Sequence, residues 1–112
     1  MDNTNEFIRL VQENPNLPII PMVDAEVVCN DYYGWWLGSF GYCEVTEYAC
    51  VNMYNEDRYV TRDDLDEIEE YFMNELLDED ETLSAEEVEA MAIEQAKALD
   101  WAKAIVVYIG TP

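Results

Sequence analysis

Charge is the feature that most constrains how this chain can fold. Asp and Glu number 26 against five Lys and Arg, which gives a formal net charge of −21 at pH 7. Repulsion among so many like charges opposes compaction. Half of the residues are nevertheless hydrophobic and 12% are aromatic, which is more than a disordered acidic chain carries. The sequence therefore predicts a folded, soluble protein, and its length suits a single domain over residues 1–112.

The same charge restricts the partners. Long-range repulsion from phosphates disfavours direct binding to nucleic acid. No apolar run approaches the roughly 18 residues of a membrane-spanning helix, so we expect no membrane partner. The charge has two explanations that the sequence leaves open. It serves solubility alone, or it attracts a basic surface on another molecule.

The cysteine and histidine content indicates the cellular compartment and limits the kinds of catalytic or metal site that the chain can form. Cys29, Cys43 and Cys50 form no C-x-x-C pair, and an odd number cannot all be joined within one chain. Together with an N-terminus that is acidic, unlike a signal peptide, this predicts reduced, buried thiols in a cytoplasm. Histidine is absent, which removes the usual general base and the commonest zinc ligand. We therefore expect a protein that is not an enzyme and uses no cofactor or metal.

The first half of the chain predicts one helix and several strands. Apolar residues with helical spacing predict a helix over residues 5–13. Two prolines make residues 18–23 an extended edge segment, and residues 26–29 predict a better strand. Residues 32–54 are rich in aromatic and β-branched side chains and predict an antiparallel meander with turns or bulges at its glycines. A turn over residues 55–57 leads to a short strand at 58–60.

The second half predicts two helices and a central strand. Thr61 is a candidate N-cap for a helix whose apolar stripe runs from Leu65 through Ile68 and Phe72 to Leu76. A capping box at Ser84 opens the next helix. The stripe of that helix is Val88, Met91, Ala92, Gln95 and Leu99. Residues 104–109 are a continuous apolar run, as in a central strand. The fold class is therefore α+β, with a small, mostly antiparallel sheet packed by two to three helices.

The acidic segment, residues 62–81, is the first candidate binding site. Eleven carboxylates lie in it and only Arg62 opposes them. Like charges three or four residues apart on a helix cost a few tenths of a kcal/mol per pair. A phosphate backbone carries about one charge per 1.7 Å of duplex axis, so this segment could occupy a protein groove built for DNA or RNA. The candidate partner-binding residues are Asp63, Asp64, Asp66, Glu67, Glu69, Glu70, Glu75, Asp78, Glu79, Asp80 and Glu81.

Trp35 and Trp36 are the second candidate partner-binding site. Core packing explains most aromatic residues in a sheet. Alternation along a strand would place the two indoles on opposite faces, leaving one exposed as an interface anchor.

A calcium-binding loop is a third, weaker candidate. Oxygen-bearing side chains occupy the ligand positions of a twelve-residue frame that begins at Asp78 and ends at Glu89. Leu83, however, lies where the sharp turn of such a loop requires glycine. The capping box at Ser84 explains the same residues without a metal.

Three segments resemble small acidic proteins of phages and mobile elements of Firmicutes. They are residues 5–24, Gly38-Ser39-Phe40-Gly41, and residues 101–109. The resemblance covers both ends and part of the middle, and it carries no assigned chemistry and no functional residues. It implies a mobile-element protein in a bacterial host cell. By analogy with small acidic phage proteins, it favours an anti-CRISPR or anti-restriction role.

These observations lead to a first hypothesis and two alternatives. The first is an inhibitor that binds a nucleic-acid-handling host protein, such as a CRISPR effector or restriction nuclease, by acidic mimicry of nucleic acid. The second is an adaptor or scaffold protein that binds through its aromatic sheet. The third is a small enzyme that uses carboxylates and a metal ion. The partner and the oligomeric state are left open.

Overall fold

The computed structural model describes residues 3–28 and 34–112, which form two compact units. Unit 1 comprises Met1–Thr46 and Lys103–Pro112, and unit 2 comprises Glu47–Ala102. Each unit has a hydrophobic core of its own, so each is described by itself. The expectation of one domain over the whole chain stays a prediction.

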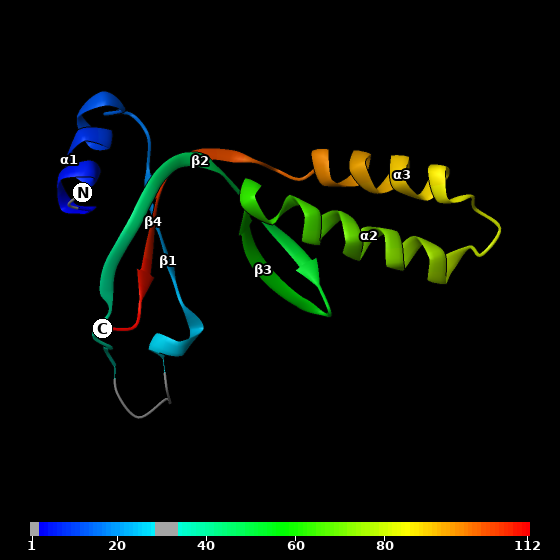
Figure 1. Cartoon of the computed structure of the whole chain (residues 1–112), viewed down its shortest axis with the longest axis horizontal. Helices are drawn as coiled ribbons and strands as arrows, with labels where there is room; N and C mark the ends of the chain where they lie inside the picture. The colour runs from blue at the N-terminus through cyan, green and yellow to red at the C-terminus, as the bar shows by residue number, and fades with distance from the viewer. Residues whose placement is uncertain (1–2, 29–33) are drawn as a thin grey trace. The chain divides into compact units, whose positions relative to one another are not determined.

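Unit 1 begins with helix α1, Asn3–Glu13, which confirms the helix predicted over residues 5–13 (Figure 1). Leu10 is its buried residue and belongs to a core cluster with Cys43, Ile105 and Val107. Phe7 lies against the same cluster and makes an edge-on ring contact with Phe40 at 5.4 Å between centroids. The apolar stripe of the helix therefore holds it on the sheet.

Strands β1, Ile19–Val23, and β4, Ala102–Gly110, are neighbours in the sheet. The strand order is β1-β4-β2-β3, where β2 is Ser39–Met53 and β3 is Glu56–Thr61. They pair in parallel. Strand β1 is at the edge, where Pro21 is tolerated because its missing N–H faces no further strand. Strand β4 is interior, and its residues 104–107 are all buried. The predicted edge segment and the predicted central strand are both confirmed.

The strand predicted over residues 26–29 is wrong, and Cys29 lies outside the described residues. Residues Ala25–Val27 form a 3-10 helix, η1. The Oδ1 atom of Asp24 accepts a hydrogen bond from the N–H of Glu26 at 2.9 Å. Such a local partner satisfies the backbone without a neighbouring strand, which favours the turn over the extended form.

Strand β2, Ser39–Met53, is a single strand of 15 residues, so the meander predicted over residues 32–54 is wrong. Of its predicted turn positions, Gly41 lies inside this strand. A Cβ atom at Gly41 would come within 2.7 Å of the carbonyl oxygen of Tyr108. Glycine is needed there for close approach of two backbones and not for a turn. Residues 32 and 33 lie outside the described part of the chain.

The turn of the chain's hairpin lies one residue earlier than predicted. Strand β2 pairs antiparallel with β3, Glu56–Thr61, and their last pair is Met53 with Glu56. Tyr54 and Asn55 form the connection with φ angles of 53° and 64°. Positive φ at both positions is the geometry of a type I′ turn, whose twist suits the flanking strands. The predicted short strand at 58–60 is part of β3.

Unit 2 adds the short 3-10 helix η2, Arg62–Asp64, and the helices α2, Leu65–Glu79, and α3, Ala85–Lys97. The N–H of Thr61 donates to the carboxylate of Asp64 at 2.9 Å, which anchors the start of this helical region. Ser84 caps α3 as predicted, since its hydroxyl accepts from the N–H of Glu87 at 3.1 Å. The two helices pack on each other in an antiparallel hairpin (Figure 1).

The predicted stripe of α2 is confirmed, and that of α3 is partly wrong. Ile68 and Leu76 are buried, with Leu65 and Phe72 packed against the cores of unit 2. On α3 the buried residues are Val88, Ala92 and Ala96, with Leu99 half-buried beyond the helix end. Met91 and Gln95 are exposed. Small alanines at every fourth position let α3 approach its neighbours, which moves the buried face by about one residue.

The fold class is α+β, as the sequence predicts. The sheet is mixed and not purely antiparallel, because β1 and β4 run parallel while β2 and β3 run antiparallel. Strand β2 contributes its first part to unit 1 and its second part to unit 2. No helix among the described residues has the length and apolar character needed to cross a membrane.

Candidate functional site

The acidic segment covers η2, α2 and the start of the connection to α3. Of its eleven carboxylates, Asp64 and Glu69 are half-buried and the rest are exposed. The exposed set is Asp63, Asp66, Glu67, Glu70, Glu75, Asp78, Glu79, Asp80 and Glu81. The apolar stripe of α2 faces the core, so these carboxylates follow the remaining faces of the helix.

The chain has no cation from residue 63 through residue 96, a run that includes all of α2 and all but the last residue of α3. The acidic segment predicted from the sequence ends at residue 81 and leaves out four further acids in this run. They are the exposed residues Glu86, Glu87, Glu89 and Glu94 of α3. The amino-acid sequence already contains this signal. The structure adds that both helices belong to one hairpin in unit 2.

The two cations that flank this run are engaged with neighbouring residues. Arg62 pairs with Glu47 at 3.0 Å, and its guanidinium lies 4.2 Å from the ring centroid of Trp101. The ammonium of Lys97 lies 4.0 Å from a carboxylate oxygen of Glu94 at the end of α3. No ion pair within the described residues neutralises a carboxylate of α2.

The charge density of α2 matches one nucleic-acid strand. Seven acids lie in its 15 residues. At about 1.5 Å rise per residue the helix is roughly 22 Å long, so it carries about one carboxylate per 3 Å. A single strand of B-form DNA has about one phosphate per 3.4 Å of axis, and the duplex has about twice that density. The sequence suggests a comparison of the acidic segment with a whole duplex, but α2 alone has only about half of the charge density of a duplex.

Two acids of the segment have a local structural role. The carboxylate of Asp64 accepts the N–H of Thr61, as described above. Oδ1 of Asp80 accepts both the N–H and the hydroxyl of Thr82. Both bonds favour the charged carboxylate and hold the pKa of Asp80 below its usual range. The bond from the hydroxyl has the larger effect. The remaining exposed acids of α2 are the better candidates for contact with a partner.

The residues of the possible calcium loop are used differently. Asp80 forms the turn with Thr82, and Ser84 caps α3. No group of three or more acidic or cysteine side chains that could hold a metal ion occurs within residues 3–28 and 34–112.

Trp35 and Trp36 lie in the irregular segment before β2, and not in a strand. Trp35 is 94% exposed, and Trp36 is half-buried against a cavity that also includes Phe40 and Ile109. The two tryptophans belong to unit 1 and the acidic segment to unit 2.

The described cysteines differ in their surroundings. Cys43 is a buried free thiol in the core of unit 1, and burial raises its pKa. It therefore acts as a small apolar side chain, as predicted. Cys50 is a free thiol on β2 and is exposed, so the expectation that it is buried is wrong. Its neighbours Ala49 and Val51 occupy the buried positions, and alternation places Cys50 on the outer face.

Comparisons with known protein families, with curated proteins and with solved structures gave no match. The functional argument therefore depends on the residues of this chain.

Proposed function

We propose that the protein is an inhibitor that binds a nucleic-acid-handling host protein and presents α2 in place of a nucleic-acid strand. One observation carries the proposal. It is the cation-free run of residues 63–96, in which α2 carries about one carboxylate per 3 Å of its length. A groove lined with Lys and Arg for phosphates would attract this helix, because the carboxylates supply the same sign of charge at a similar spacing.

The absence of compensating cations supports a binding role over a general solubility role. A surface that serves solubility usually mixes both signs of charge. Here repulsion between acids three and four residues apart on α2, such as Asp66 with Glu70 and Glu67 with Glu70, is left unrelieved. A basic partner would relieve this repulsion on binding. The resemblance to small acidic phage proteins favours a CRISPR effector or a restriction nuclease as that partner.

The partner is sought by affinity capture of the tagged, full-length protein from a Firmicute lysate treated with nuclease. We expect a DNA- or RNA-binding protein that is released by added oligonucleotide and by about 0.5 M salt, since salt screens charge contacts. Binding measured by calorimetry should then weaken steeply with salt concentration. Affinity that does not change with salt and oligonucleotide contradicts mimicry.

Two matched variants locate the contact. The first neutralises four exposed acids of α2: D66N, E67Q, E70Q and D78N. The second neutralises the four exposed acids of α3: E86Q, E87Q, E89Q and E94Q. Both change the net charge by the same amount and both keep side-chain size. We expect the α2 variant to lose about tenfold or more in affinity and the α3 variant to lose much less. Equal losses would assign the effect to net charge alone.

The adaptor hypothesis is the second candidate because of one observation in unit 1. Trp35 is 94% exposed and Leu37, two residues away, is 79% exposed, and an exposed tryptophan is a typical anchor of a protein interface. The substitution W35A distinguishes the adaptor hypothesis from mimicry of nucleic acid by α2. A loss of binding in W35A together with no loss in the α2 variant would favour an adaptor whose charge serves solubility.

A further inference from the structure

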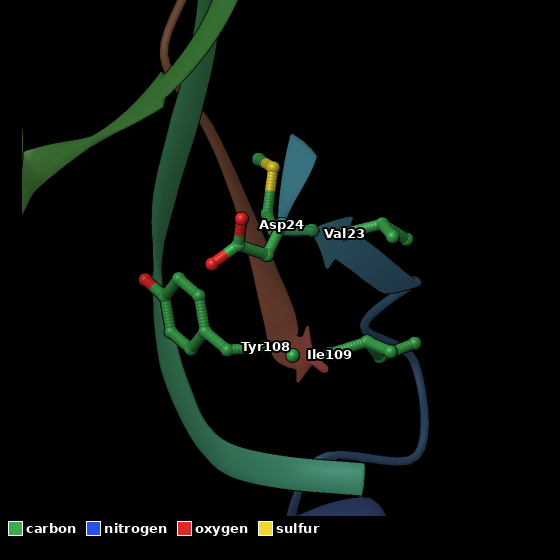
Figure 2. A pocket seen from close by; sticks show the side chains of 6 residues that line it. Val23, Asp24, Tyr108 and Ile109 are labelled. Carbon is green, nitrogen blue, oxygen red and sulfur yellow. The ribbon is translucent and has the colours of Figure 1, made fainter. Parts of the chain in front are cut away.

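A cavity of about 280 Å³ lies where strands β1 and β4 end in unit 1 (Figure 2). We call it the Asp24 pocket. Its lining residues are Met22, Val23, Asp24, Tyr108, Ile109 and Gly110. The acidic segment belongs to unit 2, so this cavity is separate from the site proposed above.

Strand register explains why these residues meet. Met22 lies opposite Tyr108 and Val23 opposite Ile109 in the parallel pair. Side chains alternate across a strand, so aligned residues share a face. Figure 2 shows the Asp24 carboxylate and the Tyr108 ring extending to one side, while Val23 and Ile109 extend to the other. A carboxylate and an aromatic ring are therefore brought together by the sheet.

Asp24 is the one charged residue among those that line the pocket. Its Oδ1 atom accepts the N–H of Glu26, as an N-cap does. The ion pairs made within the described residues involve Arg9, Arg58, Arg62 and Lys97, and none includes Asp24. The carboxylate thus has acceptor capacity beyond its cap, beside largely apolar walls.

The ring of Tyr108 is held in place by its neighbours. Its hydroxyl donates to Oε1 of Glu44 at 3.4 Å. The ring also stacks on Tyr42, with 5.9 Å between centroids and 15° between planes. A fixed aromatic ring next to a carboxylate is an arrangement that attracts a cationic side chain, and arginine in particular, because its planar guanidinium stacks on rings and donates to carboxylates.

We propose that the Asp24 pocket binds an arginine side chain of a partner protein. The side chain of Met22, which shares a face with Asp24 and Tyr108, contacts the methylene stem. The guanidinium donates to the remaining acceptor sites of Asp24 and lies against the ring of Tyr108. All residues of the Asp24 pocket belong to unit 1, so this proposal does not depend on mimicry of nucleic acid by α2.

The test is an NMR titration of the full-length protein with the blocked peptide Gly-Gly-Arg-Gly-Gly. We expect amide shifts that change at residues 22–26 and 108–110, with weak affinity. The same peptide with citrulline, which has nearly the same shape and no charge, should leave these shifts nearly unchanged. D24N keeps the capping oxygen and removes the charge, so we expect it to weaken arginine binding about fivefold or more. Y108L should weaken it about twofold to fivefold.

Two controls separate this site from general attraction to an acidic protein. D66N removes one charge from α2 in unit 2 and should leave the response of residues 22–26 unchanged. Equal binding of the citrulline peptide, or equal weakening by D66N and D24N, would overturn the proposal. Chemical-shift changes confined to residues 63–96 would also overturn the proposal of an arginine site at Asp24, but they would be compatible with the mimicry proposal.

Discussion

The guanidinium of Arg62 lies 4.2 Å from the ring centroid of Trp101, and its Nε and Nη2 atoms both donate to Oε1 of Glu47. The one cation of the acidic segment is thus shared between a ring and one carboxylate outside that segment. Trp101 is in turn fixed by its indole N–H, which donates to the carbonyl of Ala96 at 2.9 Å. This arrangement joins the end of α3 to the start of η2 within unit 2, and no ion pair among the described residues includes a carboxylate of α2.

Removal of Arg62 should therefore destabilise unit 2. We expect R62A to lower the free energy of unfolding by about 1 kcal/mol, since the pair is partly exposed and solvent screens its charge contact. R58A removes a cation of similar exposure whose carboxylate partner, Glu56, is 71% exposed against 40% for Glu47, so it should cost less. Urea denaturation followed by tryptophan fluorescence measures both. A smaller effect for R62A than for R58A contradicts this role.

Gly41 should be intolerant of a side chain. A Cβ atom there would meet the carbonyl oxygen of Tyr108 at 2.7 Å, and a backbone atom cannot move aside as the end of a side chain can. We expect G41A to lower the free energy of unfolding by about 1–3 kcal/mol. A Cβ atom at Gly110 would meet only open space, so G110A is the matched control and should change stability little. Thermal denaturation of the two variants gives the comparison, and similar melting temperatures would refute the close approach.

Salt should stabilise this protein. Repulsion among its carboxylates opposes folding, and added salt screens it. We expect the free energy of unfolding at pH 7 to rise by about 1–2 kcal/mol between roughly 0.02 M and 0.5 M NaCl. The four-acid α2 variant should show a smaller rise. Stability that falls with salt would mean that attractive ion pairs outweigh the repulsion.

Asp80 should titrate below its usual range. Hydrogen bonds from Thr82 favour the charged carboxylate and lower its pKa in the folded state. A lowered pKa stabilises the folded protein above the pKa of the unfolded chain, and this contribution is lost as pH falls through the folded-state value. T82V removes the hydroxyl bond and keeps the backbone bond, so the pKa should rise toward its usual value. Carboxyl NMR titration of Asp80 checks this, with the exposed Asp78 observed in the same experiment.

Periodicity and capping residues are sufficient to predict the helices. Apolar spacing, the proline that follows α1 at residue 15, and the cap at Ser84 act over a few residues. The extent of α1, the apolar stripe of α2 and the start of α3 therefore follow from local sequence. The apolar run at 104–109 likewise predicts an interior strand. The same local rules fail for β2, because glycine within an aromatic, β-branched segment usually indicates a turn or bulge. Gly41 is required by a backbone more than sixty residues away in the sequence, and no local pattern contains that information.

The sequence by itself determined the α+β class and the concentration of acids in one helical region, because periodicity and charge are properties of neighbouring residues. Only the tertiary structure decided that β1 runs parallel to β4, since strand pairing depends on contacts between distant segments. That pairing brings Asp24 and Tyr108 to the same pocket, which no sequence motif predicted. The structure also decided which acids have local hydrogen-bond partners, because Asp64 and Asp80 differ from the neighbouring acids only in lying where the backbone turns.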